Sequence, residues 1–224
     1  MSFVSDPQGY GFADDFSEIY SDTLFGGLER NEPEPGSLLC FRPNETQEPF
    51  TRAVAFIVDN NHDGALAVQL DLRSQTAIHE VFPEWDQAMA KPKAFYIGGP
   101  VENQRPICIG VLNAAGRSLE AGTTDSQGEP LFEPIAHNFA WVNLGANPEE
   151  VQPYLKGARI FVGYLGWSPG QLDDEIQRGD WYVAPALASD VLSGPGDDVW
   201  SDVMRRQPWP LPLYATFPRD LQEN

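Results

Sequence analysis

The chain has 224 residues, of which 33 are Asp or Glu and 14 are Lys or Arg, so its formal net charge is −19. The length fits one domain with additional terminal segments. The acidic excess argues against direct binding to nucleic acid and to anionic membranes, because both depend on Lys and Arg. Hydrophobic residues make up 42% of the chain, which is enough to build a core and excludes a wholly disordered protein.

Residues 1–34 form an acidic segment that we interpret as a leader preceding the folded body. They carry eight acidic residues and one basic residue, and such blocks of like charge are usually solvated. A short helix with one apolar face is predicted from the spacing of Phe16, Ile19, Tyr20 and Leu24. Met1–Phe12 lacks Lys, Arg and any apolar run, so we expect no secretory signal, and no stretch has the roughly 18–20 apolar residues of a membrane span.

Residues 35–207 are predicted to form a body of short strands and helices. Short segments rich in Val, Ile and Phe, bounded by Gly, Pro or Asn, are typical of strands. They are Ser37–Phe41, Arg52–Val58, Gly64–Leu70, Ala94–Ile97, Ile107–Leu112, Phe139–Leu144 and Ala158–Tyr164. Helices are predicted at Thr76–Phe82, Glu84–Ala90, Pro148–Leu155, Pro169–Arg178 and Asp197–Gln207. This order favours an α+β fold with a mainly antiparallel, strongly bent sheet or partly open β-barrel flanked by helices.

Three further segments carry simpler expectations. Residues 113–133 hold three glycines, one proline and polar residues, which predicts a surface loop. Residues 208–224 form a Pro-rich tail in which Trp209 is expected to lie exposed or against the body, on an extended stretch that a partner could recognise. Cys40 and Cys108 lie between apolar neighbours on predicted strands, so we expect two reduced, buried thiols and a cytoplasmic location.

The segment Asp59–Gly64 matches the first half of a calcium-binding loop, D-x-N-x-D-G. That loop needs a Glu at its twelfth position, which is Leu70 here, and the flanking segments are predicted strands. The pattern is more typical of a hairpin turn in which Asp63-Gly64 supplies the positive φ. Asp59 and Asp63 are therefore only weak candidates for a metal ion. No zinc spacing, dinucleotide motif or phosphate loop is present in the sequence, and no cofactor is expected.

The segment Gly166–Gly170 fits G-x-S-x-G, the pattern of a hydrolase nucleophile between a strand and a helix. Pro169 has no N–H to offer to an oxyanion hole, and all three histidines precede Ser168 in the chain. We therefore interpret Ser168 as the N-cap of a helix, with Pro169 at N1 and Gln171 at N3 completing a capping box.

The helix after this turn is predicted to direct Leu172 and Ile176 to the core and to end before Gly179. Two interpretations of this strand–turn–helix unit stay open. In the first, Trp167 and the start of the helix line a ligand pocket. In the second, the same residues only pack against the core.

Five motifs of the chain resemble the AlgH/YqgE family of bacterial proteins. They are Pro35-Gly36-Ser37-Leu38-Leu39, Phe50-x-Arg52-Ala53-Val54, Asp63-Gly64-Ala65-Leu66, Gly98-Gly99-Pro100-Val101 and Gly163-Tyr164-x-Gly166-Trp167-x-x-Gly170-Gln171-Leu172-x-x-Glu175-Ile176 with Trp181. The resemblance covers about residues 35–207 and implies a single α+β domain with a strongly bent sheet or partial barrel. Members of the family are often labelled transcriptional regulators, and no biochemical activity is established for the family as a class.

We therefore expect a non-enzymatic binding or regulatory protein that acts through protein or small-ligand contacts, as a monomer or a small homo-oligomer. The candidate binding residues are Gly99, Pro100, Trp167, Gln171, Glu175 and Trp181. No catalytic residue is assigned. The alternative is a hydrolase-like enzyme that uses acidic residues, such as Asp59, Asp63 or Glu175, with a metal ion or water. It requires two of those carboxylates to converge in one cavity.

Overall fold

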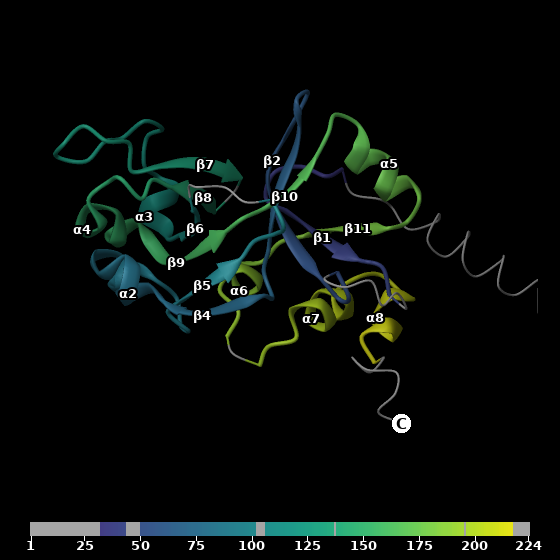
Figure 1. Cartoon of the computed structure of the whole chain (residues 1–224). Helices are drawn as coiled ribbons and strands as arrows, with labels where there is room; N and C mark the ends of the chain where they lie inside the picture. The colour runs from purple at the N-terminus through teal and green to yellow at the C-terminus, as the bar shows by residue number, and fades with distance from the viewer. Residues whose placement is uncertain (1–31, 44–49, 102–105, 137, 195, 217–224) are drawn as a thin grey trace, which may run out of the picture. The chain divides into compact units, whose positions relative to one another are not determined.

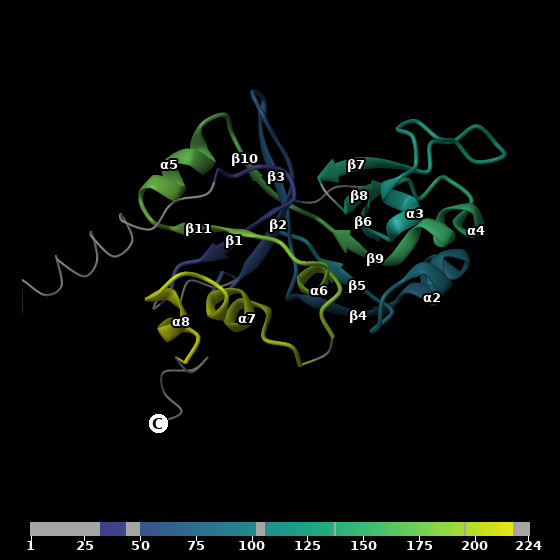
Figure 2. The same ribbon diagram turned by 180° about the vertical axis from the view of Figure 1, so that it is seen from behind.

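The computed structural model describes residues 32–43, 50–101, 106–136, 138–194 and 196–216. These residues form two β-sheets accompanied by short helices (Figure 1), and the same arrangement is seen from behind in Figure 2. The chain divides into two units, Met1–Arg30 and Asn31–Asn224. The helix expected at Phe16–Leu24 lies outside the described residues, and both sheets belong to the second unit.

The first sheet has five antiparallel strands in the order β10-β3-β2-β1-β11. The strands are β1 (Ser37–Phe41), β2 (Val54–Asn61), β3 (Gly64–Gln69), β10 (Leu165–Trp167) and β11 (Trp181–Pro185). Alternate residues of a strand share one face of a sheet. Residues such as Leu39, Ile57 and Val183 therefore gather on one face of this sheet, where Leu172 and Ile176 of α5 (Gln171–Gln177) pack against them.

The second sheet has six strands in the order β4-β5-β9-β6-β8-β7. The strands are β4 (Arg73–Ala77), β5 (Ala94–Ile97), β6 (Ile107–Leu112), β7 (Phe132–Ala136), β8 (Phe139–Val142) and β9 (Leu155–Val162). Among the pairings of these described strands, only β5 with β9 is parallel. The predicted α+β, mainly antiparallel architecture is therefore confirmed, with the strands divided between two sheets.

Short helical segments cover the core of the six-stranded sheet. They are α2 (Ile78–Val81), a 3₁₀ helix (Pro83–Ala88), α3 (Ala114–Arg117), α4 (Pro148–Val151) and a second 3₁₀ helix (Gln152–Tyr154). Trp85 is buried in this core, and its indole N–H donates to the carbonyl oxygen of Leu144 at 3.2 Å. α4 begins as predicted, with Asn147 as its N-cap and Pro148 in the first turn.

A glycine-lined crossing carries the chain from β9 of one sheet into β10 of the other. A Cβ atom on Gly163 would lie 2.4 Å from the carbonyl oxygen of Gly99, and a Cβ atom on Gly99 would lie 2.2 Å from the carbonyl carbon of Tyr164. Val101 and Tyr164 pair through reciprocal backbone hydrogen bonds of 3.1 and 3.0 Å. Two of the sequence motifs therefore touch each other, at a distance that excludes side chains on these glycines.

The C-terminal helices α6 (Ala188–Val191), α7 (Val199–Arg205) and α8 (Leu211–Tyr214) follow β11 (Figure 1). The indole N–H of Trp200 on α7 donates to the carbonyl oxygen of Phe41 at 2.9 Å. The Arg52 guanidinium lies 4.5 Å from the Trp200 ring centroid and donates to Asp198 and Ser201. These contacts join α7 to the end of β1 and to the chain before β2.

Several sequence expectations are corrected by the fold. The helix predicted at Thr76–Phe82 is the end of strand β4 followed by the single turn α2. The predicted loop at residues 113–133 contains α3 and the first residues of β7, and the expected extended stretch after Pro208 contains the short helix α8. Propensity alone does not separate such short elements, because packing against neighbouring elements decides them. Trp209 is 69% exposed.

None of the helices in the described part of the chain combines the length and the apolar character that crossing a bilayer requires.

Both cysteines are free and buried, as expected from their apolar neighbours. Burial raises the pKa of the Cys40 thiol and of the Cys108 thiol far above the ordinary value, because a thiolate is poorly solvated there.

We predict that neither thiol reacts with an aromatic disulfide reagent at pH 8 while the protein is folded, and that both react after unfolding in urea. Rapid reaction of the native protein would contradict the buried placement.

Asp125 organises the turn before β7 and the start of α4. Its carboxylate accepts the backbone N–H of Asn147 at 2.8 Å and those of Gln127 and Glu129 at 2.8 and 2.9 Å. These donors, led by Asn147, hold the pKa of Asp125 below its ordinary value. A carboxyl whose pKa is lowered by folding stabilises the folded state at any pH above its pKa in the unfolded chain, and this stabilisation is lost as the pH falls.

Urea unfolding from about pH 5 to pH 2 should therefore show a steeper loss of stability in wild type than in Asp125→Asn. Equal slopes would contradict this role of Asp125.

Candidate ligand-binding site

A cavity of about 350 Å³ lies where the turn before α5, α5 itself, β10 and the ends of β1 and β11 meet. It is lined by Phe41, Phe50, Pro100, Val101, Leu165, Gly166, Trp167, Gln171, Glu175, Arg178, Asp180 and Trp181. These residues come from distant parts of the chain. Most lie on or next to β1, β10, β11 and α5 at the five-stranded sheet, whereas Pro100 and Val101 follow β5 of the six-stranded sheet. The volume is within the range of small-molecule sites.

The Glu175 carboxylate is the hydrogen-bonding centre of this cavity. Its Oε2 atom accepts the indole N–H of Trp167 at 2.8 Å and that of Trp181 at 3.0 Å. Its Oε1 atom accepts the amide N–H of Gln171 at 3.0 Å. One carboxylate on α5 therefore orients two tryptophans that belong to opposite edge strands of the sheet, and it satisfies both of their polar atoms.

Aromatic rings form the walls of the cavity around Trp181. The ring centroids of Phe41, Phe50 and Trp167 lie 5.1, 5.9 and 6.0 Å from that of Trp181, with interplanar angles of 69°, 77° and 82°. Such nearly perpendicular packing is one of the favoured arrangements of aromatic pairs. This packing fixes the four rings in different orientations along the wall of the cavity.

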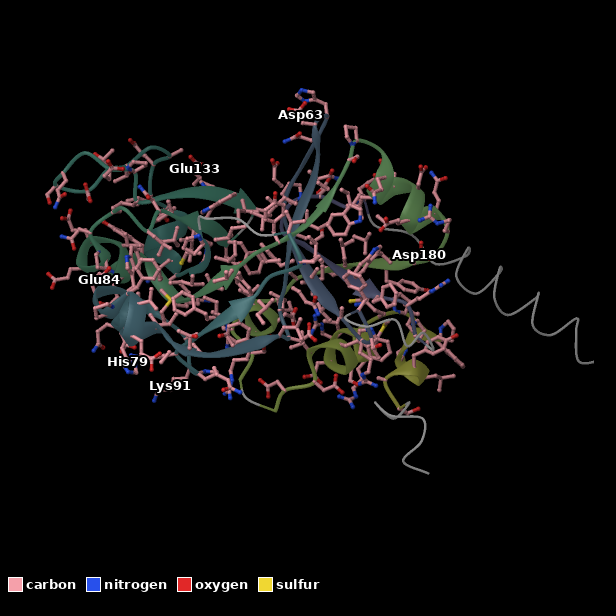
Figure 3. All side chains as sticks on the ribbon, in the orientation of Figure 1. Asp63, His79, Glu84, Lys91, Glu133 and Asp180 are labelled. Atoms are coloured by element: carbon pink, nitrogen blue, oxygen red, sulfur yellow. The ribbon has the colours of Figure 1, made fainter. Side chains whose placement is uncertain are left out.

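Asp180 and Arg178 form an ion pair at the rim of the cavity. The Asp180 Oδ2 atom lies 3.0 Å from Nη2 of Arg178, and its Oδ1 atom lies 3.6 Å from Nη1 of Arg42. Asp180 lies three residues after the last residue of α5 and close to the end of that helix (Figure 3). The charge of this carboxylate is thus balanced by neighbouring guanidinium groups, in contrast to that of Glu175, whose three donors are neutral.

The start of α5 differs from the sequence expectation. The N-cap is Gly170, with φ of +76°, and the helix begins at Gln171, so the assignment of Ser168 as the N-cap is wrong. One half of the expected capping box does form, because the Gln171 side chain accepts the Ser168 N–H at 3.1 Å. The positive φ of Gly170 turns the chain between Ser168 and the helix. Gln171 is then the first residue of α5, and the helical spacing places it one turn before Glu175.

The end of α5 is as predicted. Gly179 has φ of +80° and its N–H donates to the carbonyl oxygen of Ile176, while the Asp180 N–H donates to that of Glu175. This pair of bonds is a Schellman motif. It reverses the chain so that Asp180 and Trp181 return to the cavity beside Glu175.

The structure brings five of the six candidate binding residues, Pro100, Trp167, Gln171, Glu175 and Trp181, to one cavity. The sixth, Gly99, lies behind the wall and permits the backbone contact that sets Pro100 and Val101 in place. Sequence reasoning missed the aromatic residues Phe41 and Phe50 as lining residues. A signal for Phe50 was available, since it begins one of the family motifs, whereas nothing in the sequence marks Phe41.

The acidic residues of the hairpin do not join this cavity. Asp63 lies at the tip of the β2–β3 hairpin, apart from Asp180 (Figure 3), and its side chain is 82% exposed. Asp59 accepts a hydrogen bond from the Asn61 side chain at 2.7 Å. The hairpin itself is as predicted, although only Gly64 of the Asp63-Gly64 pair has a positive φ.

The enzyme alternative required two of these carboxylates in one cavity, and neither Asp59 nor Asp63 lines the cavity that contains Glu175. In the described ranges, no group of three His, Cys, Asp or Glu side chains is placed to hold a metal ion.

The fold and the cavity together define an α+β protein of two sheets with an aromatic pocket beside its five-stranded sheet. The family model described as AlgH-like matches residues 38–212, and the chain belongs to this family. The match runs through α7 and into α8.

Curated relatives and solved structures agree with this assignment. A UPF0301 protein of Corynebacterium efficiens is 47% identical over 93% of this chain and all of its own length, and one of Corynebacterium glutamicum is 42% identical over 88% of this chain. A crystal structure of a Corynebacterium diphtheriae protein matches with a TM-score of 0.80 at 44% identity, covering 88% of this chain and all of its own. The solution structure of AlgH from Pseudomonas aeruginosa shares the fold, with a TM-score of 0.55 at 20% identity over 85% of this chain and 98% of its own.

Proposed function

We propose that this protein binds a small ligand in the cavity around Trp167, Glu175 and Trp181, and that it is a binding or regulatory protein rather than an enzyme. The observation that carries the proposal is the contact of one Glu175 oxygen with both indole N–H groups. This contact holds two aromatic walls in position before a ligand arrives. A preorganised site binds more tightly, because less side-chain ordering is needed on association.

The chemistry of the cavity supports binding over catalysis. Both oxygens of Glu175 are engaged by neighbouring side chains, and the other lining carboxylate, Asp180, is held in an ion pair. Any regulatory role would then act through the ligand or a protein contact, because a chain of net charge −19 is poorly suited to bind nucleic acid directly. A cytoplasmic location stays a prediction, and two free buried thiols are compatible with it.

The proposal is tested by the indole N–H signals of the ¹⁵N-labelled protein during a screen of neutral, cationic and anionic fragments. We expect at least one fragment to move the signals of Trp167 and Trp181 and to leave that of Trp85, which lies in the other core, unchanged. No movement of the Trp167 and Trp181 signals with any fragment would overturn the proposal.

Gln171→Ala provides the matching variant test. Gln171 is exposed on α5 and contacts Glu175, so its truncation should preserve the fold and weaken a fragment that binds by about tenfold, the equivalent of one hydrogen bond of about 1.4 kcal/mol. Gln87→Ala, at an exposed position of the first 3₁₀ helix, is the control and should keep wild-type affinity. Wild-type affinity in folded Gln171→Ala would place the fragment elsewhere.

A further inference from the structure

The charge of Glu175 is not balanced by an ion pair. Of the two lining carboxylates, Asp180 pairs with Arg178 and with Arg42 outside the lining. The three donors to Glu175 are the neutral side chains of Trp167, Trp181 and Gln171. Within the residues that the structure describes, no Lys or Arg forms an ion pair with Glu175. Glu175 is therefore the lining carboxylate whose negative charge meets no guanidinium of the described residues directly, and an anionic group placed beside it would be repelled.

The aromatic walls favour the same ligand charge. The face of an aromatic ring carries negative electrostatic potential and attracts cations, most strongly for Trp. Elsewhere in the described residues two rings already hold an internal cation: Arg52 lies over Trp200 at 4.5 Å and Arg159 over Tyr96 at 4.3 Å. No such partner lies over Trp181 within the same described ranges. Trp181 and its nearly perpendicular neighbours Phe41, Phe50 and Trp167 all line the same cavity, so a group that enters it meets several aromatic rings.

We infer that the ligand of this cavity carries an organic cation, namely an alkylammonium group; this inference rests on the proposed function. The group would lie near Glu175 and among the four aromatic rings of the lining, which are those of Phe41, Phe50, Trp167 and Trp181. Cages of aromatic rings recognise substituted ammonium groups in proteins, and a nearby carboxylate adds electrostatic attraction to them. The volume of about 350 Å³ suits a molecule of the size of choline or a lysine side chain. The net charge of −19 would also raise the local concentration of cations.

The test compares choline with 3,3-dimethylbutan-1-ol, which has the same shape and no charge. Both are titrated into the full chain while the indole signals of Trp167 and Trp181 are followed. We expect choline to bind at least tenfold more tightly than the neutral alcohol. Glu175→Gln keeps the size of the side chain and removes its charge, so it should reduce this preference to less than threefold. Glu149→Gln, which removes an exposed carboxylate on α4 outside the cavity lining, is the matched control and should keep it.

A capped tripeptide with a central lysine serves as a second cationic probe. If it binds more tightly than choline, the alkylammonium group comes from a protein partner, and if choline binds more tightly, it comes from a free small molecule. Both results support the inference.

The inference and the proposed function fail in distinguishable ways. Equal binding of choline and the neutral alcohol, or binding of neutral or anionic fragments alone, would overturn the cationic ligand and leave the cavity a binding site. If no probe or fragment moves the Trp167 and Trp181 signals, both are overturned. Loss of the choline preference in Glu175→Gln is interpreted only if its unfolding in urea is cooperative and its Trp85 signal is unshifted.

Discussion

Gly163→Ala should lower the free energy of unfolding by about 2–5 kcal/mol. The backbone of Gly163 has φ of +74°, a conformation that costs an L-residue with a side chain about 1–2 kcal/mol. The new methyl group would also lie 2.4 Å from the carbonyl oxygen of Gly99. Backbone atoms cannot rotate away as a side chain would, so overpacking adds about 1–3 kcal/mol. Urea unfolding followed by circular dichroism measures the total.

The control for this substitution is Gly128→Ala. Gly128 has a similar φ of +88°, yet a Cβ atom there would have no neighbouring atom within 4 Å. Its loss of stability should be confined to the conformational cost of about 1–2 kcal/mol. The difference between the two variants isolates the close contact of the crossing between β9 and β10. Equal losses in both variants would show that this crossing accommodates a side chain.

Arg206→Met should destabilise the protein by about 3 kcal/mol, because it leaves a buried carboxylate without its cation. Asp190 is 4% exposed, and its two oxygens accept hydrogen bonds from the Arg206 guanidinium at 2.9 and 2.8 Å. In the variant, the N–H of Leu187 is the one remaining donor to Asp190 that the described contacts include. Thermal and urea unfolding should both report the loss.

The neighbouring residue provides an internal comparison. Arg205 pairs with Asp202 at 2.8 Å on the exposed face of α7, and such surface pairs contribute less than about 1 kcal/mol. Arg205→Met should therefore have little effect. Adding Asp190→Asn to Arg206→Met should recover part of the stability, since it removes the unpaired charge. A double variant less stable than Arg206→Met would contradict the assignment of the loss to buried charge.

These two stability predictions bear on the candidate site, because both variants alter elements that hold its lining residues in place. Gly163 permits the approach of the backbone around Gly99, which carries Pro100 and Val101 into the cavity wall. α7, to which Arg206 is attached, contacts Phe41 through Trp200 and holds Arg52, two residues after Phe50. Fold defects at these positions should weaken ligand binding together with stability, whereas Gln171→Ala should separate the two.

Much of the site could be predicted from residues that are close in the sequence. Trp167 ends strand β10, and Gln171 and Glu175 lie on α5, so the three residues fall within nine positions of the sequence. The i, i+4 spacing of Gln171 and Glu175 places these two on one side of the helix. Phe41 could not be predicted as part of the site, because its place depends on the pairing of β1 with β11, which brings it opposite Trp181. No local pattern encodes which strands pair.

The error at Ser168 shows the same limit on a smaller scale. Ser168, Pro169 and Gln171 match a capping box in sequence, and residue preferences alone support that assignment. The approach of β10 to Gly64, where a Cβ atom would lie 2.2 Å from the carbonyl oxygen of Trp167, constrains the chain just before the helix. The turn is completed instead by the positive φ of Gly170, so the helix begins later.

The amino-acid sequence by itself determined the α+β class, the bounds of strands such as β1, β5 and β6, the burial of both cysteines and the local unit that carries Glu175. These features follow from apolar periodicity and turn residues, which act over a few positions. Only the tertiary structure decided the division into two sheets, the contact between the motifs that contain Gly99 and Gly163, and the packing of three aromatic rings around Trp181. Each of these joins residues far apart in the chain, and long-range packing and backbone pairing, rather than local propensity, determine which of them meet.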